Sequence, residues 1–314
     1  MAPRSEASLA AVLLTQRLVD VPVEPLKAAE YWTVLDRVGD LASLLGLDAD
    51  RVATSGVEFS LAERMVHRFD AATALAFALD ELEQSGVRVV SSVDDGYPAS
   101  LRELGHRAPP ALYAAGNVGL LATPLLGIVG SRDVAEDGAQ IAGDAARAAV
   151  AHGLGVVSGG ARGVDRLAMQ GALESDGIAV GVLADSLLRT VRDPDVRRAI
   201  TDGQLCVCSP YRPLAPFTVA NAMGRNKIVY ALSQATFVVA SDLEQGGTWG
   251  GATEALRRNI APVVVWTGAG AGLGNAKLVE LGATPVASID ELFPLPGRVS
   301  SVEASPSKQL ALEV

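Results

Sequence analysis

The sequence predicts an α/β protein, with a small helical N-terminal domain followed by a doubly wound, mostly parallel sheet. The first observation is a segment, about residues 5–85, in which apolar residues recur every three or four positions. The second is the change after Gly86 to short apolar strands that alternate with helical stretches, which is typical of βαβ crossovers. The third is size, because 314 residues of which 49% are hydrophobic suffice for about two domains with full cores.

The helical domain is predicted over residues 1–85. Its helical stretches are SLAAVLLTQRLV, LKAAEYWTVLDRVG and LAERMVHRFDAATALAFALDELEQSG. Prolines and glycines at the joints, among them Pro25 and Gly56, divide it into several short elements.

The sheet domain is predicted over residues 86–293. VRVVSSV and ALYAAG are its first strand candidates, and regular alternation begins at Leu125. The order is LLGIVG, a helix over about 136–152, LGVVSGG, a helix over about 165–174, GIAVGVLAD, QLCVCS, a helix after Asn226, ATFVVASD, a helix over about 252–259, and APVVVWTG. Residues 294–314 are rich in Ser and Pro and are expected to form a flexible tail.

The charge balance argues against a protein that coats nucleic acid through bulk charge. The chain has 36 acidic and 26 basic residues, a net charge of −10, so a polyanion site must be local. Cys206 and Cys208 are two residues apart, which places both side chains on one face of a predicted strand. We interpret them as small core residues of a protein from a reducing compartment. The three histidines are far apart in sequence, and neither a metal nor a cofactor is expected.

No apolar run reaches the roughly 18 to 20 residues that cross a bilayer. The apolar patch near the N-terminus is interrupted by Gln16 and Arg17 and precedes no clear processing site. We therefore expect a cytoplasmic protein without membrane contact.

Ligands of a doubly wound sheet bind at the carboxyl ends of the strands, so the loops after the strands hold the candidate site. The first loop contains Gly130, Ser131 and Arg132, where backbone N–H groups and a guanidinium suit a phosphate. An ordinary strand-to-helix turn is the alternative. The second loop, SGGARGVD, supplies Ser158, Gly159, Gly160, Arg162 and Gly163, and Asp165 is interpreted as a helix cap rather than a catalytic acid.

The third and fourth loops contribute further candidates. Arg225, Asn226 and Lys227 are placed at a helix start, where cations are unfavourable unless an anion compensates them. The fourth loop supplies Gly246, Gly247, Thr248 and Trp249, and the indole could either stack on a base or pack over the loop. Glu254 is favoured as a first-turn partner of the helix dipole over a general acid or base.

Over roughly residues 60–265 the motifs resemble the DNA-processing protein A family, DprA or Smf. Gly-Ser-Arg is matched by Gly130 to Arg132, Ser-Gly-x-Ala-Arg-Gly-x-Asp by residues 158–165, and Arg-Asn-Arg-Ile by residues 225–228. The lead-in with Tyr97 and Pro98 also matches. Met169 replaces a family histidine, and the sequence after about residue 293 is too short for the winged helix of many members.

The resemblance implies a SAM- or HhH-like helical domain followed by a Rossmann-like domain that forms a homodimer. It also implies single-stranded DNA binding and loading of the RecA recombinase, with Ser131, Arg132, Arg162, Arg225 and Lys227 against the phosphates. The apolar strand over 261–266 is a candidate dimer edge.

Two alternatives remain open at this point. One is a nucleotide sensor or an N-glycosidic hydrolase, because Gly246, Gly247, Gly250 and Glu254 resemble a variant of the Gly-Gly-x-Gly-Thr-x-x-Glu loop of the LOG enzymes. The other is a partner-binding module without a ligand. DNA binding without catalysis is the favoured interpretation.

Overall fold

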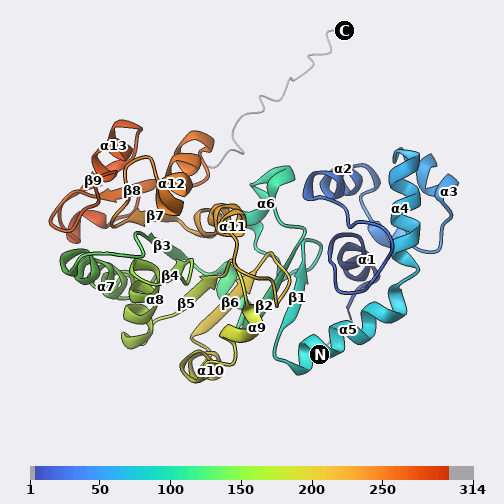
Figure 1. The fold of residues 1–314 in the computed structure, drawn as a ribbon, viewed down its shortest axis with the longest axis horizontal. Helices are drawn as coiled ribbons and strands as arrows, with labels where there is room; N and C mark the ends of the chain where they lie inside the picture. Colours follow the sequence, from blue (N-terminus) through green and yellow to red (C-terminus); the bar gives the residue numbers. More distant parts are fainter. Residues whose placement is uncertain (1–3, 297–314) are drawn as a thin grey trace, which may run out of the picture.

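A sheet with helices on both faces forms the centre of the structure, a computed structural model that describes residues 4–296 (Figure 1). In that range the strands are β1 (Arg88–Ser91), β2 (Ala111–Gly116), β3 (Leu125–Val129), β4 (Gly155–Ser158), β5 (Ala179–Val182), β6 (Leu205–Ser209), β7 (Ala235–Val238), β8 (Val263–Trp266) and β9 (Thr284–Val286). The α-helices of that range are α1 (Glu6–Thr15), α2 (Ala28–Val38), α3 (Ala49–Thr54), α4 (Phe59–Phe69), α5 (Ala72–Gln84), α6 (Ala99–Arg102), α7 (Glu136–Ala151), α8 (Val164–Glu174), α9 (Leu187–Thr190), α10 (Pro194–Thr201), α11 (Val219–Leu232), α12 (Gly246–Arg258) and α13 (Asn275–Glu280).

The strand order of the described residues is β1-β2-β6-β5-β4-β3-β7-β8-β9; β2 pairs antiparallel with both β1 and β6, and the neighbours from β6 to β9 are parallel. From β3 the chain adds β4, β5 and β6 on one side and then returns to place β7 on the other side of β3. The predicted doubly wound, mostly parallel α/β class is confirmed. The reversal between β3 and β7 is the point at which such sheets bind ligands.

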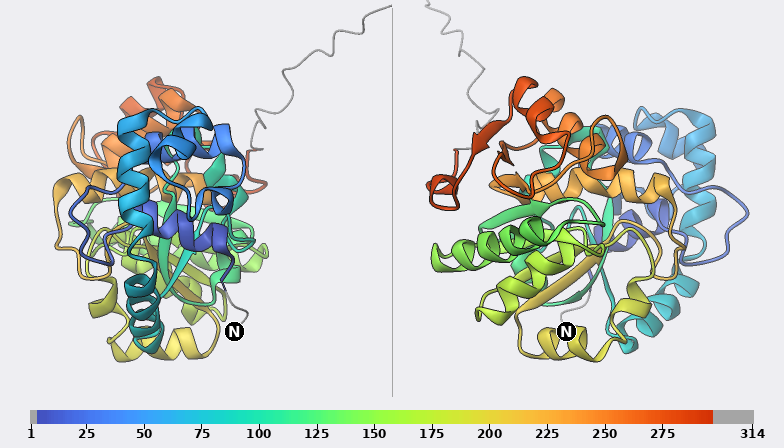
Figure 2. Two further views of the ribbon diagram at one scale, coloured as in Figure 1. Left: turned by 90° about the vertical axis from the view of Figure 1, so that its right-hand side faces the viewer. Right: turned by 60° about the vertical axis from the view of Figure 1, so that its left-hand side comes forward.

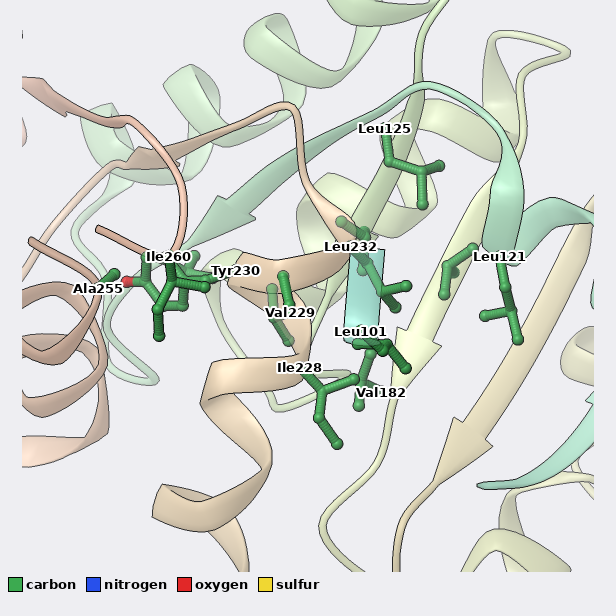
Figure 3. Close-up of a cluster of buried hydrophobic side chains, with 14 of the residues drawn as sticks. Leu101, Leu121, Leu125, Val182, Ile228, Val229, Tyr230, Leu232, Ala255 and Ile260 are labelled. Atoms are coloured by element: carbon green, nitrogen blue, oxygen red, sulfur yellow. The ribbon is translucent and has the colours of Figure 1, made fainter. Parts of the chain in front are cut away.

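Alternate residues of each central strand face opposite helical layers, because side chains in a strand point to the two faces in turn. Leu126 and Ile128 of β3 pack with α7 and α8, whereas Leu125 and Val129 pack with α11 and α12. Figure 3 shows the second layer, in which Ile228 of α11 lies among Leu101 of α6 and other apolar side chains. The apolar strand runs reflect burial on both faces.

The N-terminal helices pack against the β1 end of the sheet, away from α12 and α13 (Figures 1 and 2). One buried cluster contains Leu13 and Leu14 of α1 together with Val89 of β1 and Val207 of β6. Tyr31 hydrogen-bonds Ser92 across the same contact at 2.7 Å. The predicted boundary near residue 85 therefore divides the chain in sequence, while the two parts share a core.

Two helices begin earlier than the sequence suggested. We expected α11 to start near Arg225, but it begins at Val219, because the Thr218 hydroxyl accepts the N–H of Asn221 at 3.0 Å and caps it. Similarly, α12 starts at Gly246 rather than near residue 252. Its glycines let it approach α11 closely: a Cβ on Gly251 would lie 3.1 Å from Tyr230 Cε2.

Two further expectations concern an edge of the sheet and the C-terminal tail. The strand over 261–266 was a candidate dimer edge, but this is wrong, because β8 lies between β7 and β9. Of the predicted tail, residues 297–314 lie outside the described residues, whereas Leu295 packs against the cluster under α7. Within residues 4–296 no helix has the length and apolar character needed to span a membrane.

Candidate functional site

A cavity of about 360 Å³ lies at the switch point, between the ends of β3 and β7 and the helices α11 and α12. Its wall residues come from the end of β3, from the loops after β3, β4 and β7, from the start of α8, from α11 and the loop before it, and from the start of α12: Val129, Gly130, Ser131, Arg132, Asp133, Ala161, Asp165, Phe217, Val219, Ala222, Met223, Arg225, Asn226, Val229, Tyr230, Asp242, Gln245, Gly246, Gly247 and Thr248. We call this the switch-point cavity.

The loop after β3 contributes all three of its predicted residues to the cavity wall. The N–H of Ser131 donates to the Ala240 carbonyl at 2.8 Å and ties this loop to the end of β7. The Arg132 guanidinium lies 5.0 Å from the centre of the Phe217 ring, a cation–π distance. Gly130 has no room for a side chain, since a Cβ would lie 2.6 Å from Val164 Cγ2.

The loop after β4 packs against residues that form or adjoin the cavity wall. Ser158 is buried and donates to the Ile128 carbonyl at 2.6 Å, and a Cβ on Gly159 would overlap the Arg225 guanidinium. Gly163 precedes α8 with φ of 79°. Like Ser158, the predicted residues Gly159, Gly160, Arg162 and Gly163 are outside the cavity wall, to which this loop contributes Ala161.

Arg162 was expected beside Arg132 as a second cation of the site. It is instead exposed and is not a wall residue, although it forms an ion pair at 2.8 Å with Asp133, which is one. An exposed pair of this kind contributes little to stability. Its position leaves it available only at the outer edge of the site.

Asp165 and Arg225 are both buried wall residues of the cavity, and their opposite charges influence each other. Asp165 was expected to cap α8, and this is wrong, since Gly163 holds the cap position and Asp165 is the second residue of the helix. Burial raises the pKa of Asp165, while the charge of Arg225 and the N–H groups of Ala161 and Gly130 act in the opposite direction. Burial lowers the pKa of Arg225, and Asp165 opposes that change.

Arg225 therefore does not stand at a helix start where the dipole disfavours it. It is the seventh residue of α11 and is only 6% exposed. Its Nε has no hydrogen-bond partner among residues 4–296, and the same holds for the buried hydroxyl of Tyr230. Both side chains belong to the cavity wall. An unsatisfied buried polar atom is costly, so two of them beside a cavity indicate a polar ligand.

The first turn of α12 forms another wall, with Gly246, Gly247 and Thr248. Asn226 holds it in place, because its Nδ2 donates to the Gly247 carbonyl at 2.8 Å. The free N–H groups and the dipole of a helix start attract anions. Trp249 is half-buried, packs against the apolar core and is not part of the cavity wall.

Lys227 and Glu254 lie apart from the cavity. Lys227 follows Asn226 on α11 and is half-buried, with a pKa that burial lowers. Glu254 was expected in the first turn of a helix, but it is the ninth residue of α12. Its Oε1 contacts Arg258 at 3.1 Å and Arg107 at 3.4 Å. The hydrolase alternative thus lacks its proposed acid or base at the cavity.

Sequence reasoning missed an apolar rim around the cavity mouth. The rim consists of three exposed apolar wall residues from the loop before α11 and from α11: Phe217, Val219 and Met223. The signal was present in the stretch LAPFTVANAM, whose large apolar residues precede the motif at residues 225–228.

A family model described as DNA recombination-mediator protein A matches residues 88–295, a range that contains β1 to β9. The DprA-type DNA processing protein of Mycobacterium tuberculosis is 30% identical over 314 aligned residues, covering 91% of this chain and 80% of the relative. Protein Smf of Escherichia coli is 26% identical over 167 residues, covering 52% of this chain and 44% of that protein.

Among solved structures, DNA processing protein A from Streptococcus pneumoniae matches with a TM-score of 0.70 and 22% identity, covering 92% of this chain and 97% of that one. The Helicobacter pylori protein, whose structure was described for its single-stranded DNA binding mode, matches with a TM-score of 0.55 and 24% identity over 66% of this chain and 95% of that one. At these identities the two structures support the fold.

Proposed function

Because the chain belongs to the DNA recombination-mediator protein A family, we propose that it binds single-stranded DNA at the switch-point cavity without cleaving it. The observation that carries the proposal is the pair of unsatisfied buried groups, Arg225 Nε and the Tyr230 hydroxyl, in a wall that also contains Arg132 and the start of α12. A phosphate placed there would accept from all of these donors.

The apolar rim supports a strand with unstacked bases. Phe217 is 46% exposed and Val219 is 72% exposed, and exposed apolar side chains that gather at one cavity are typical of an interaction site. Single-strand binders combine a cationic track with surfaces on which bases stack. Arg132 lies over Phe217 and places a cation next to the only aromatic ring of the rim. A duplex, whose bases are already stacked, would not use such a rim.

Two carboxylates in the cavity wall indicate that the ligand also carries hydrogen-bond donors. Asp133 is paired with Arg162, and Asp242 lies in the loop after β7, beside Gly246. Carboxylates repel phosphates but accept hydrogen bonds from the amino groups of bases. We therefore place a phosphate near Arg132 and Arg225, and a base edge near Asp242.

The proposal is tested by replacing Arg132 with alanine. Affinity for a fluorescent single-stranded oligonucleotide should fall roughly 10- to 100-fold, because a charge-assisted hydrogen bond is lost. The plot of log affinity against log salt should become less steep by about 0.7, the contribution of one phosphate on a single strand. Fluorescence anisotropy between low and moderate salt measures both.

Arg147→Ala is the matched control, because Arg147 is an exposed arginine on α7 that pairs with Asp144 and is not a wall residue. It should bind like the unaltered protein. Absence of oligonucleotide binding by the unaltered protein at low salt would contradict the proposal.

We also propose, from family membership, that the protein acts in the cytoplasm as a homodimer and helps to load RecA onto the bound strand. Light scattering coupled to size exclusion would report the dimer. Strand-exchange assays with RecA in the presence and absence of this protein would report loading, and no stimulation would remove this part of the proposal.

A further inference from the structure

A second group of cations converges behind α11, at the opposite end of the sheet from the switch-point cavity. Arg107 from the short 3-10 helix η2 (Gly105–Arg107), Lys227 from α11 and Arg258 from the end of α12 all face Glu254. We call these four side chains the Glu254 cluster. Its arginines border a separate cavity of about 210 Å³. The wall of this cavity includes Ala261 and Pro262, just before β8, and shares no residue with the wall of the switch-point cavity.

One carboxylate cannot neutralise three cations. The two arginines contact the same oxygen, Oε1 of Glu254, each through a single nitrogen, whereas a guanidinium offers five N–H donors. Glu103, which also borders the cavity, is the second carboxylate of the neighbourhood, so three positive charges face two negative ones. In a chain with a net charge of −10, such a local excess of cations needs an explanation.

The state of Lys227 agrees with this imbalance. Burial lowers the pKa of its ammonium group, Glu254 opposes that change, and the charges of Arg107 and Arg258 lower the pKa further. Like charges are thus close enough to repel one another. An additional anion at the cavity would relieve the repulsion.

The remaining polar groups of this cavity suit a phosphate. Ser100 of α6 offers a hydroxyl, and Asn259, directly after α12, offers an amide. Arg258 is the last residue of α12, where the helix dipole favours a cation and holds it at this position. Guanidinium forks with hydroxyl and amide donors are the usual partners of phosphate oxygens.

We propose that the cavity beside Arg107 and Arg258 is a second phosphate-binding site. The phosphate comes either from free solution or from the backbone of a DNA strand that extends beyond the switch-point cavity. The chemistry of recognition is the same in both cases, and the two sources differ in whether strand length matters.

The first arm of the test uses inorganic phosphate. With arginines labelled by ¹⁵N, the Nε–Hε signals of Arg107 and Arg258 should shift and saturate as phosphate is added, while chloride at equal ionic strength should not move them. Glu103→Gln removes an opposing charge and should strengthen phosphate binding several-fold, which a purely structural cluster would not do. The proposal is overturned if, in both the unaltered protein and Glu103→Gln, the Arg107 and Arg258 signals do not respond to phosphate with saturation.

The second arm uses oligothymidylates of 6 and 24 nucleotides with the double variant R107Q/R258Q. If the phosphate belongs to the strand, affinity for the 24-mer should fall roughly tenfold, and affinity for the 6-mer should not change. Arg147→Gln is the matched control. Equal affinity for the 24-mer, together with saturating phosphate shifts, assigns the site to free phosphate and supports the proposal in that form.

The two proposals fail differently. If neither oligonucleotide binds the unaltered protein, the proposed DNA binding fails, and the phosphate titration still decides on the second site. If both oligonucleotides bind but phosphate produces no saturating shift and the double variant behaves normally, the second site alone is rejected.

Discussion

Replacing Arg225 with leucine is expected to destabilise the fold by about 3 to 5 kcal/mol, because it removes the positive charge that acts on the buried Asp165 carboxyl. Both side chains are almost inaccessible, at 6% exposure each. The free energy of unfolding in urea, followed by circular dichroism, measures the loss. DNA binding should disappear in the same variant, since Arg225 also forms part of the cavity wall.

A double-mutant cycle separates the pair from the remaining effects of the substitution. Asp165→Asn combined with Arg225→Leu should be less destabilised than Arg225→Leu alone, because the unpaired charge is gone. Arg162→Leu is the control, since that arginine is exposed and its pair with Asp133 contributes little. Additive effects of the two substitutions would show that Asp165 and Arg225 do not depend on each other.

Replacing Arg68 with leucine should destabilise the N-terminal part by about 3 kcal/mol or more. The Arg68 guanidinium is buried and donates to three carbonyls, those of Leu13, Gln16 and Val23, which would be left unsatisfied at about 1 kcal/mol or more each. These carbonyls belong to the end of α1 and the segment after it, so Arg68 holds that segment against α4.

Hydrogen exchange measures where the loss falls. Protection should decrease in α1 and α4 first and should spread to β1 and β2, because these elements share a buried cluster. Arg51→Leu, at an exposed arginine of α3, is the control. Unchanged unfolding free energy in Arg68→Leu would mean that water replaces the guanidinium at the three carbonyls.

Much of the fold could be predicted because it depends on local pattern. Strands such as β2 and β6 appear in the sequence as short apolar runs, and α7 appears as a periodic stretch at nearly the observed bounds. The starts of α11 and α12 could not be predicted in the same way. Glycines at 224, 246, 247, 250 and 251 resemble turns, and they are helical here because close packing of α11 on α12 offsets their weak helix propensity.

The candidate site, too, could be predicted where it depends on local sequence and could not where it depends on packing. Strand-end loops are local features, and the order of strands and helices already placed Ser131, Arg132 and Thr248 on one edge of the sheet, where the structure has them. Which way a helical side chain points depends on the exact start of its helix, since each residue turns the direction by about 100°. Neighbouring Arg225 and Lys227 therefore serve different places, one in the switch-point cavity and one in the Glu254 cluster.

The sequence by itself determined the α/β class, the order of the elements and the phosphate-friendly composition of the strand-end loops, because these follow from periodicity and residue type. Only the tertiary structure decided that the charges of Arg225 and Asp165 act on each other, that Glu254 faces Arg107, and that Phe217 lies under Arg132. Each of those contacts joins residues far apart in the chain, and their distance is set by how the helices pack on the sheet, which no local pattern records.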